Sequence, residues 1–430
     1  MVKVRSTLGY CVYFGALALC SMLLLHVLLY ECYYRYDVLD YRRLQARVLQ
    51  RHGLRQATHR GLLVCLTDAT LPLGLSLVKE LRTLGSRDAI FAYHCMGALS
   101  PISRELLREL DVVVYDACAD LISFGLLTAR DAASYHGEAL TLLALLHAPI
   151  EHVIVLDAGN VVFADPSLLW SSPAYAETGT RFFYEREVLA DAYLTGHVRR
   201  HAKSTHLHRL MEHFEYGLFR LPTGEPSPAL EASLAWHGHS SVEQDLSMLA
   251  LHKVRIADAF PVLWHLLRDT RYRIPFSKGT QELLWLSLEL VQMPYAFSPW
   301  AETLVSNTSS SVLCGSRGQY LPSDVNSLFY LRARDLVDPY LMQSTMPGGM
   351  LTLEVIDARA KVLEAQIPSF VGPRRTRSAM AAADPKADTC LANQRAEPLF
   401  KAIRDQITRR VATAASMARR HQARLQQRMY

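Results

Sequence analysis

Hydrophobic residues between positions 61 and 156 alternate between short runs and longer stretches with helical spacing. Four apolar runs have the length of buried strands: 62–66, 90–93, 112–115 and 153–156. Apolar residues lie three and four positions apart in the stretches between them, as on an amphipathic helix: 72–84, 101–110 and 136–148. Strands that alternate with helices predict an α/β fold, with a parallel sheet covered by helices on both faces.

The pattern continues beyond residue 160 with apolar-aromatic runs and a leucine-rich helix. Residues 182–184 form a predicted strand after a break at Thr178–Gly179, and residues 328–331 form a later one. Ser240–Lys253 contains another strand-like run, and the leucine spacing within 276–290 predicts a helix. These segments extend the same α/β domain toward the C-terminus.

The N-terminal segment has the length and composition of a membrane anchor. Residues 9–30 contain no Asp, Glu, Lys or Arg and are long enough to cross a bilayer as a helix. The run is longer than the core of a cleaved signal peptide and has no clear cleavage site, which favours a retained signal anchor. Residues 1–8 are then a cytosolic tail, and residues 31–58 a helical stem with a solvated face.

Charge is concentrated at the C-terminal end of the chain. The formal net charge is +5, but residues 371–430 alone hold 13 Lys/Arg against 4 Asp/Glu. The preceding part is therefore net negative, which gives no support to a nucleic-acid-binding role. Half of all residues are hydrophobic, so the chain can fill a sizeable globular core.

The region 346–430 departs from the α/β pattern. Ala, Arg and Pro dominate residues 371–397, which predicts disorder. Residues 398–428 are basic with apolar positions at helical spacing, which predicts a helix. We expect this helix to be a solvated appendage; binding to a membrane surface or to a partner are the alternatives.

Cysteine and histidine residues give weaker signals. Five of the 8 cysteines follow the stem, without a CxxC pair: Cys65, Cys95, Cys118, Cys314 and Cys390. One or two disulfides can form among them in an oxidising compartment, although Cys65 and Cys95 fit small buried hydrophobes equally well. Six histidines gather between 201 and 239 as a metal site or, more simply, a solvated His-rich loop: His201, His206, His208, His213, His237 and His239.

The run 153–156 ends at an acidic residue, Asp157, which Ala158, Gly159 and Asn160 follow. Ligands of open α/β sheets bind just outside the carboxyl ends of the strands. A carboxylate at this place can hold a divalent cation against a diphosphate. The simpler alternative is a buried strand whose terminal aspartate caps the next element.

A second polar group, Glu243–Gln244–Asp245, stands directly before an apolar run. These side chains could bind sugar hydroxyls at a strand edge. Ser240 and Glu243 equally fit a capping box at the start of a helix. Common motifs of other α/β enzymes, GxGxxG, GxxxxGK[ST] and GxSxG, are absent, which disfavours dinucleotide-binding, P-loop and hydrolase functions.

Five sequence blocks occur in the order of one family: 60–86 (RGLLVCLTDATLPLGLSLVKELRTLGS), 147–170 (HAPIEHVIVLDAGNVVFADPSLLW), 178–186 (TGTRFFYER), 240–253 (SSVEQDLSMLALHK) and 278–290 (KGTQELLWLSLEL). Together they resemble the α-1,3-mannosyltransferase-like, fungal-type Golgi α-mannosyltransferases. The likeness covers residues 59–345. It implies a GT-A-like, Rossmann-like nucleotide-diphospho-sugar transferase domain behind a single N-terminal transmembrane helix.

The resemblance implies a function, a cofactor and site residues. The reaction is a retaining transfer of mannose from GDP-mannose to a glycan or glycoprotein acceptor, assisted by Mn²⁺. Asp157 corresponds to the first carboxylate of the Asp-x-Asp motif and to the metal ligand. The candidate catalytic residues are Asp245, Glu243 and Glu282. The candidate donor-binding residues are Thr67, Asp68, Asp157, Ala158, Gly159, Asn160, Thr178 and Gly179.

The chain departs from the family pattern at three places. The second Asp-x-Asp carboxylate falls on Gly159, which cannot bind a metal through a side chain. Thr280–Gln281 replace an Asp-Lys pair, and Thr141 stands where a lysine is common. Fewer charged groups at a diphosphate site weaken stabilisation of the leaving group. The alternatives are a metal-independent enzyme, a degenerate glycan-binding or scaffolding subunit, and a membrane-tethered adaptor that works through the C-terminal helix.

Family resemblance also implies a location. It places the chain in the Golgi membrane as a single-pass type II protein with a lumenal domain. A Golgi glycosyltransferase complex is the partner assembly that this location implies. Asn307-Thr308-Ser309 is an N-glycosylation acceptor and agrees with that side. Charge alone favours the opposite topology, because two basic residues precede the anchor and four follow it within residues 31–47.

Overall fold

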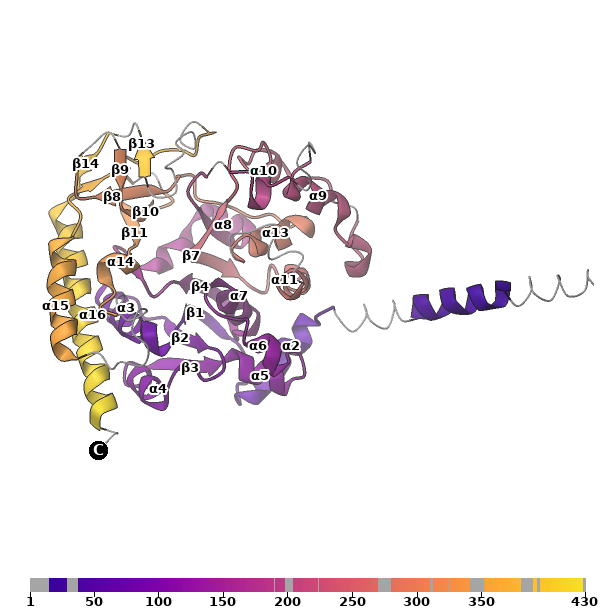
Figure 1. Cartoon of the computed structure of the whole chain (residues 1–430), viewed down its shortest axis with the longest axis horizontal. Helices are drawn as coiled ribbons and strands as arrows, with labels where there is room; N and C mark the ends of the chain where they lie inside the picture. Colours follow the sequence, from indigo (N-terminus) through magenta and orange to yellow (C-terminus); the bar gives the residue numbers. More distant parts are fainter. Residues whose placement is uncertain are drawn as a thin grey trace, which may run out of the picture.

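The computed structural model shows a central sheet between two helical layers (Figure 1). It describes residues 15–28, 38–188, 190–197, 204–222, 224–269, 280–309, 312–323, 325–340, 352–379, 390–392 and 395–427. The central sheet has the order β3-β2-β1-β4-β7-β6. Its strands are β1 (Thr58–Cys65), β2 (Ala89–His94), β3 (Val112–Asp116), β4 (Ile150–Leu156), β6 (Thr180–Tyr184) and β7 (Gln244–His252).

Strand direction confirms the predicted parallel sheet in its first half. β1 pairs in parallel with both β2 and β4, and β3 continues the parallel set beside β2. β7 runs antiparallel to β4 and β6. After β1 the chain forms β2 and β3 on one side of β1, and then returns to form β4 on the other side. The boundary between β1 and β4 is therefore a topological switch point.

Side chains of the central strands alternate between two cores. Leu63 and Val155 point into one core, with α2, α5, α7, α11 and α13. Leu62 and Leu156 point into the other, with α3, α4 and α16. The helices are α2 (Tyr41–Arg51), α3 (Leu71–Thr83), α4 (Pro101–Arg108), α5 (Ala117–Ser123), α6 (Ala129–Ala132), α7 (Glu138–His147), α8 (Pro173–Thr178), α9 (His206–His213), α10 (Pro228–Glu231), α11 (Ala259–Arg268), α13 (Leu283–Leu290), α14 (Arg334–Val337), α15 (Leu353–Ala365) and α16 (Lys401–Gln427).

A second, antiparallel sheet joins the end of β4 to the C-terminal half of the chain. Its order is β14-β12-β8-β10-β11-β5. The strands are β5 (Asn160–Val162), β8 (Thr303–Ser306), β10 (Ser316–Tyr320), β11 (Leu328–Arg332), β12 (Phe370–Val371) and β14 (Glu397–Pro398), and β9 (Val312–Cys314) pairs separately with β13 (Cys390–Ala392). β11 pairs with β5 so that Arg332 lies opposite Asn160. This pairing brings residues 332–338 beside Asp157.

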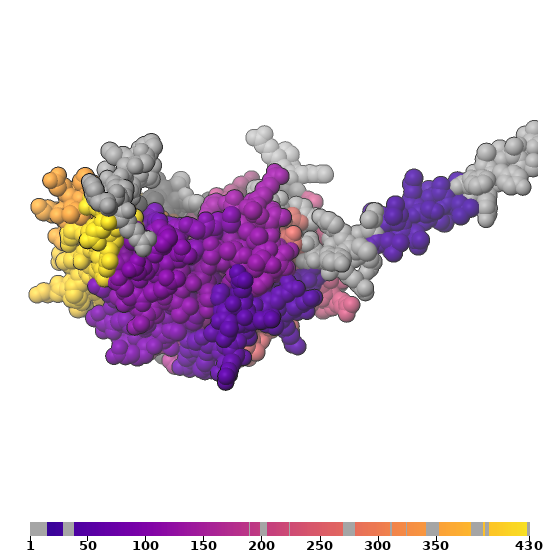
Figure 2. All heavy atoms as spheres, turned by 90° about the horizontal axis from the view of Figure 1, so that it is seen from below, coloured from indigo at the N-terminus to yellow at the C-terminus, as the bar shows by residue number. Residues whose placement is uncertain are grey.

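At both chain ends the predicted helices are present where the structure describes them, but they pack on the domain. Within the predicted stem, Tyr41, Leu44 and Val48 of α2 are buried in the main core, because α2 docks on α7. The predicted appendage is a packed helix: α16 lies along α3 and α15 (Figures 1 and 2). Residues 371–379, predicted to be disordered, form β12 and the ordered segment after it.

Two disulfides cross-link the domain. Cys95 bonds to Cys118, and Cys314 bonds to Cys390. The first corrects the alternative of Cys95 as a reduced hydrophobe, whereas Cys65 is free. The second ties the C-terminal strand β13 to β9.

The predicted anchor at 9–30 lies partly outside the described residues. Residues 15–28 are helical. Among the described segments, no helix combines the length and the apolar character needed to cross a membrane.

Candidate functional site

Asp157 lies at the carboxyl end of β4 and is exposed to solvent. Its backbone N–H donates to the Ser247 carbonyl at 2.8 Å, which ties the residue to β7. Its Oδ1 accepts the Gly159 N–H at 2.7 Å, which orients the carboxylate. The residue is therefore an oriented, accessible acid at the switch point between β1 and β4, where α/β sheets bind ligands.

Two residues of neighbouring elements lie close to this acid. Cys65 ends β1, and Thr141 of α7 hydrogen-bonds to its thiol. Burial raises the pKa of Cys65 to about 12, with the Asp157 charge as a smaller contribution in the same direction. The thiol is thus neutral, and Thr141 brings no charge to this place.

Gly159 lies between Asp157 and Arg334. A Cβ at position 159 would stand 2.9 Å from the Arg334 Cβ, 3.2 Å from its Cα and 3.0 Å from Asp157 Oδ1. Real Cβ atoms do not approach neighbours this closely, so an aspartate at 159 would require the backbone of α14 to move. The position of the second carboxylate in the Asp-x-Asp motif is taken by an arginine backbone.

Arg334 places its Cα and Cβ against this turn, and its guanidinium pairs with Asp338. Its side chain is 53% exposed, and its Nε donates to Asp338 Oδ2 at 3.0 Å. Ala333, one residue earlier, donates its N–H to the Gly159 carbonyl at 3.2 Å, which fixes the start of α14 against the turn. The guanidinium is held at its base and is open to solvent.

The groups around Asp157 do not fit the predicted Mn²⁺ site. Mn²⁺ prefers several oxygen ligands, above all carboxylates. Asn160, the nearest substitute, is fully buried, and its Nδ2 donates to the Ser247 carbonyl at 2.8 Å. Its Oδ1 has no hydrogen-bond partner but is also enclosed. Asp157 is thus the one accessible carboxylate of the turn 157–160, with an arginine beside it.

The three predicted catalytic acids are buried, each with several partners. Asp245 accepts hydrogen bonds from the Tyr330 hydroxyl at 2.9 Å and the Ser247 N–H at 2.8 Å, and it pairs with Arg332 at 3.2 Å. Glu243 pairs with Arg377. β7 begins directly after Glu243, so the capping-box alternative is wrong. A catalytic role for these acids stays a prediction.

Glu282 is enclosed completely at the start of α13. It accepts the Glu243 N–H at 3.0 Å and the Trp285 Nε1–H at 2.6 Å. Burial raises the pKa of its carboxyl to about 7. The residue joins α13 to β7, and its catalytic role also stays a prediction.

The sequence did not reveal a buried network of acids and arginines beside β6 and β7. The Arg375 guanidinium donates to both oxygens of Glu187, at 2.6 and 2.7 Å. Arg377 lies over the ring of Tyr184, 4.6 Å from its centroid, and pairs with Glu243. The Arg-rich run 374–377 is the sequence feature that could have indicated this network, although the composition of 371–397 predicts disorder. The described C-terminal segment therefore packs under the sheet edge.

The predicted donor-binding residues separate into two groups. Thr67 and Asp68 follow β1 and lie on the same edge as Asp157, although Asp68 Oδ1 accepts the Ser100 N–H at 2.9 Å. Gly179 lies at the opposite edge, where its carbonyl accepts the His252 N–H at 2.7 Å. His252 pairs with His152 at the start of β4, about 16 Å along the strand from Asp157. The structure does not bring Thr178 and Gly179 to this site.

The predicted histidine cluster does not come together in the described residues. His206 Nδ1 lies 2.9 Å from the Tyr193 carbonyl, and His208 Nδ1 lies 2.7 Å from Thr205 Oγ1. His201 lies outside the described residues. Another group, His52, Asp120 and His147, does converge.

Comparison with known proteins gives one family match over part of the chain and several distant structural similarities. Residues 126–312 match the family described as "Mannosyltransferase putative". No curated protein matches the chain. Part of the chain is similar to three solved glycosyltransferases. The bifunctional WbbM is 10% identical, over 57% of this chain and 39% of that chain, with a TM-score of 0.35. GlyE of Streptococcus pneumoniae TIGR4 is 12% identical, over 56% of this chain and 45% of that chain, with a TM-score of 0.31, and the galactosyltransferase LgtC with donor and acceptor sugar analogs is 12% identical, over 55% and 73%, with a TM-score of 0.32. The chain thus spans less than half of the first two.

The family match contains Asp157 and part of its surroundings, whereas Cys65, Arg334 and Arg410 lie outside it. Residues 126–312 include α7, β4, Asp157, β7 and α13. Asp157 and most of its neighbours therefore lie in the segment that carries the relationship. This match confirms the mannosyltransferase-like resemblance of the sequence over residues 126–312, which are 187 of the 430 residues.

Proposed function

We propose that the chain transfers mannose from GDP-mannose to a glycan or glycoprotein acceptor with retention of the anomeric configuration. The observation that carries this proposal is the exposed, oriented carboxylate of Asp157 at the β1–β4 switch point. The family match over residues 126–312 supports the mannosyl class. The donor diphosphate would lie at the strand edge beside Asp157.

Arg334 is the group that best suits the departing diphosphate. Transfer breaks the bond between the anomeric carbon and the phosphate oxygen, while the acceptor oxygen bonds to that carbon and loses its proton. The leaving GDP gains negative charge, and stabilisation of developing charge is usually the largest catalytic effect. The guanidinium of Arg334 can bind phosphate oxygens in a bidentate manner. Asp157 Oδ2, the oxygen not bound to Gly159, can accept hydrogen bonds from donor hydroxyls.

The test is a panel of nucleotide sugars with the full chain in detergent, each assayed with Mn²⁺ and with EDTA. We expect turnover of GDP-mannose that persists in EDTA and is lost in Asp157→Asn. Absence of turnover with every donor, from protein shown to be folded, would contradict the proposed activity. Turnover only with Mn²⁺ would keep the activity and reject the role of Arg334.

The proposed location is the Golgi membrane, with residues 9–30 as a type II anchor and the domain in the lumen. Two disulfides support this location, because structural disulfides persist in oxidising compartments. Asn307 is exposed after β8, where a glycosylation machinery can reach it.

A second candidate is a degenerate glycosyltransferase that binds glycan or serves as a subunit of a Golgi glycosyltransferase complex. The observation that favours it is the burial of Glu243, Asp245 and Glu282 together with the loss of the second motif carboxylate at Gly159. In this case Asp157→Ala leaves cellular function intact. An active enzyme loses most of its activity with the same substitution.

A further inference from the structure

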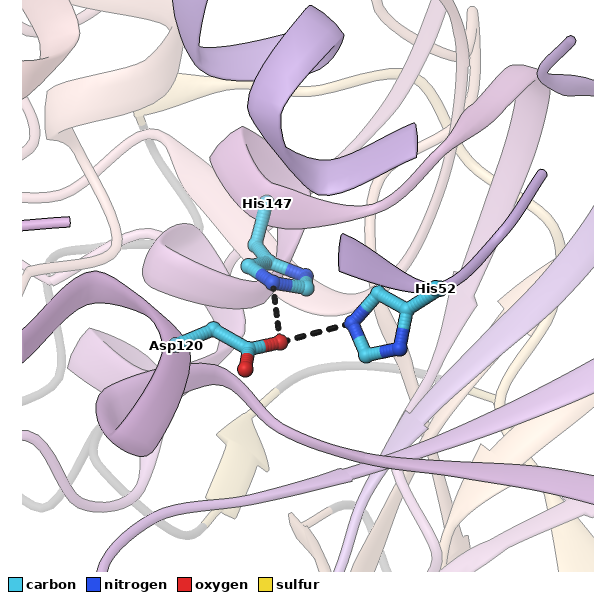
Figure 3. A group of neighbouring side chains, drawn as sticks. All are labelled: His52, Asp120 and His147. Carbon is cyan, nitrogen blue, oxygen red and sulfur yellow. Dashed lines mark hydrogen bonds and ion pairs between the residues drawn. The ribbon is translucent and has the colours of Figure 1, made fainter. Parts of the chain in front are cut away.

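Three side chains from three helices converge at a place that the proposed reaction does not use. His52 caps the end of α2, Asp120 lies in α5, and His147 ends α7 (Figure 3). Asp120 Oδ2 lies 2.7 Å from His52 Nε2 and 3.1 Å from His147 Nε2. One ligand atom from each residue lies within 4.8 Å of the other two.

Two imidazole nitrogens and one carboxylate oxygen are the ligands that zinc takes from proteins. In a tetrahedral site with bonds of about 2.0–2.1 Å, ligand atoms stand about 3.3 Å apart. The two separations from Asp120 Oδ2, 2.7 and 3.1 Å, are shorter than that value by about 0.6 and 0.2 Å, so side-chain rotations would accommodate the ion. Calcium and magnesium prefer sites made of oxygen, so this donor set selects a transition metal.

The surroundings supply the outer contacts that metal-binding histidines usually have. The Tyr93 hydroxyl lies 3.1 Å from His147 Nδ1 and can accept its proton, which leaves the lone pair of Nε2 for a metal. His147 is fully buried. The ring of Tyr115 lies 4.3 Å from that of His52 and covers the outer side.

Positive charge near the cluster is limited. Arg51 Nε lies 3.4 Å from Asp120 Oδ1, on the carboxylate oxygen away from the histidines. The Arg51 side chain is 57% exposed and can move into solvent. Lys253 contributes a more distant positive charge at His147. A metal ion would therefore displace one mobile surface cation from the carboxylate.

We propose that His52, Asp120 and His147 bind one Zn²⁺ ion, with water in the fourth position. The site lies before β4, at the opposite end of that strand from Asp157. Its ligands join α2 to α5 and α7, so the ion fixes the first helix of the domain to the main core. The role is structural and independent of donor binding.

Zinc binding is tested with the full chain in detergent after removal of metal by a chelator. The stripped protein is titrated with Zn²⁺ in competition with a chromophoric chelator, and in parallel with Co²⁺, whose visible absorption reports tetrahedral coordination. We expect one Zn²⁺ per chain, a tetrahedral Co²⁺ spectrum and a higher Tm with zinc. His52→Gln and Asp120→Asn should each weaken binding by at least about 100-fold.

The matched control is His237→Gln with His239→Gln, a pair of exposed histidines whose rings lie 6.4 Å apart. This double variant should bind zinc as the unmodified chain does. His52 lies at the surface edge of the cluster, with 24% of its side chain exposed, so its substitution keeps the fold even if changes at buried His147 do not. The proposal is overturned if the unmodified chain binds no Zn²⁺, if His52→Gln binds it equally well, or if the control loses binding to the same extent.

Discussion

At the scale of single residues, the proposed function assigns neutralisation of the donor diphosphate to Arg334, which lies beside Gly159. We expect Arg334→Ala to lower kcat for GDP-mannose by about 100-fold, because it removes a charge that stabilises the leaving group. Arg334→Lys should keep part of the activity, since it keeps the charge but loses the bidentate geometry. Rates measured in EDTA check both variants.

Arg108→Ala, at the exposed end of α4, is the control for Arg334 and should leave the rate unchanged. Equal rates for Arg334→Ala and the unmodified enzyme would show that another group neutralises the diphosphate.

Glu282 makes stability depend on pH. Its folded pKa of about 7 lies above the usual value of 4.5, because burial disfavours the carboxylate. Between these two values the folded chain holds a proton that the unfolded chain has released, so stability falls as pH rises from about 4.5 to 7. The loss is on the order of 3 kcal/mol. Thermal unfolding at pH 5 and pH 8 should show a smaller difference for Glu282→Gln, which imitates the neutral acid; an unchanged difference would assign the effect to other groups.

The sequence predicts Asp157 as a site residue because an acid at the end of an apolar run needs no tertiary information. It does not predict that Glu243, Asp245 and Glu282 are enclosed. Asp245 pairs with Arg332 and Glu243 with Arg377, and these arginines lie 87 or more positions from their partners. Glu282 is enclosed because it accepts the Glu243 N–H and the Trp285 Nε1–H. Thr178 and Gly179 lie away from Asp157 for a similar reason. The direction of β6 in the sheet is set by its pairing with β7, which no local sequence pattern encodes.

At the scale of elements, α16 supports the candidate site from behind. Arg410 is fully buried and donates to the carbonyls of Leu73 at 3.1 Å, Ala158 at 2.9 Å and Asn160 at 3.3 Å. Its Nε lies 3.5 Å from Glu80 Oε2. The C-terminal helix thus holds both α3 and the turn that carries Asp157.

We expect Arg410→Ala to destabilise the protein by about 3–5 kcal/mol, because it leaves the Glu80 carboxylate buried without its cation. The remaining folded protein should also lose activity, since the 158–160 carbonyls lose their donor. Chemical denaturation followed by tryptophan fluorescence measures the first effect. Arg409→Ala, the exposed neighbour, should change stability by less than about 0.5 kcal/mol, and a similar loss in both variants would contradict the support role.

Helical periodicity predicted α16, but its basic composition suggested a solvated helix. The buried arginine explains the difference: Arg410 satisfies four backbone or carboxylate oxygens, so a residue that counts as polar in the pattern belongs to the interior. Deletion of the tail therefore cannot separate an adaptor role from an enzymatic one, because the deletion removes part of the core.

At the scale of the whole molecule, the disulfide Cys314–Cys390 closes the longer of the two loops. The bonded cysteines are 76 residues apart, compared with 23 for Cys95–Cys118. The entropy of loop closure predicts a stabilisation of about 4 kcal/mol for the longer loop and about 3 kcal/mol for the shorter. Cys314→Ser with Cys390→Ser should therefore lower the Tm more than Cys95→Ser with Cys118→Ser, measured without reductant. The reverse order would indicate that strain or residual structure outweighs loop length.

The proposed location at the scale of the whole molecule can be tested at the exposed acceptor Asn307. Its loop after β8 is accessible, and its Nδ2 makes one contact at 3.2 Å with the Gln366 carbonyl, which glycosylation can displace without entering the core. If the domain is lumenal, endoglycosidase treatment of the cellular protein should increase its gel mobility, and Asn307→Gln should abolish that shift. Thiol alkylation without reductant should leave Cys314 and Cys390 unlabelled in the same sample. Labelled cysteines together with an unglycosylated chain would place the domain in the cytosol. The excess of basic residues after residues 9–30 favours that orientation.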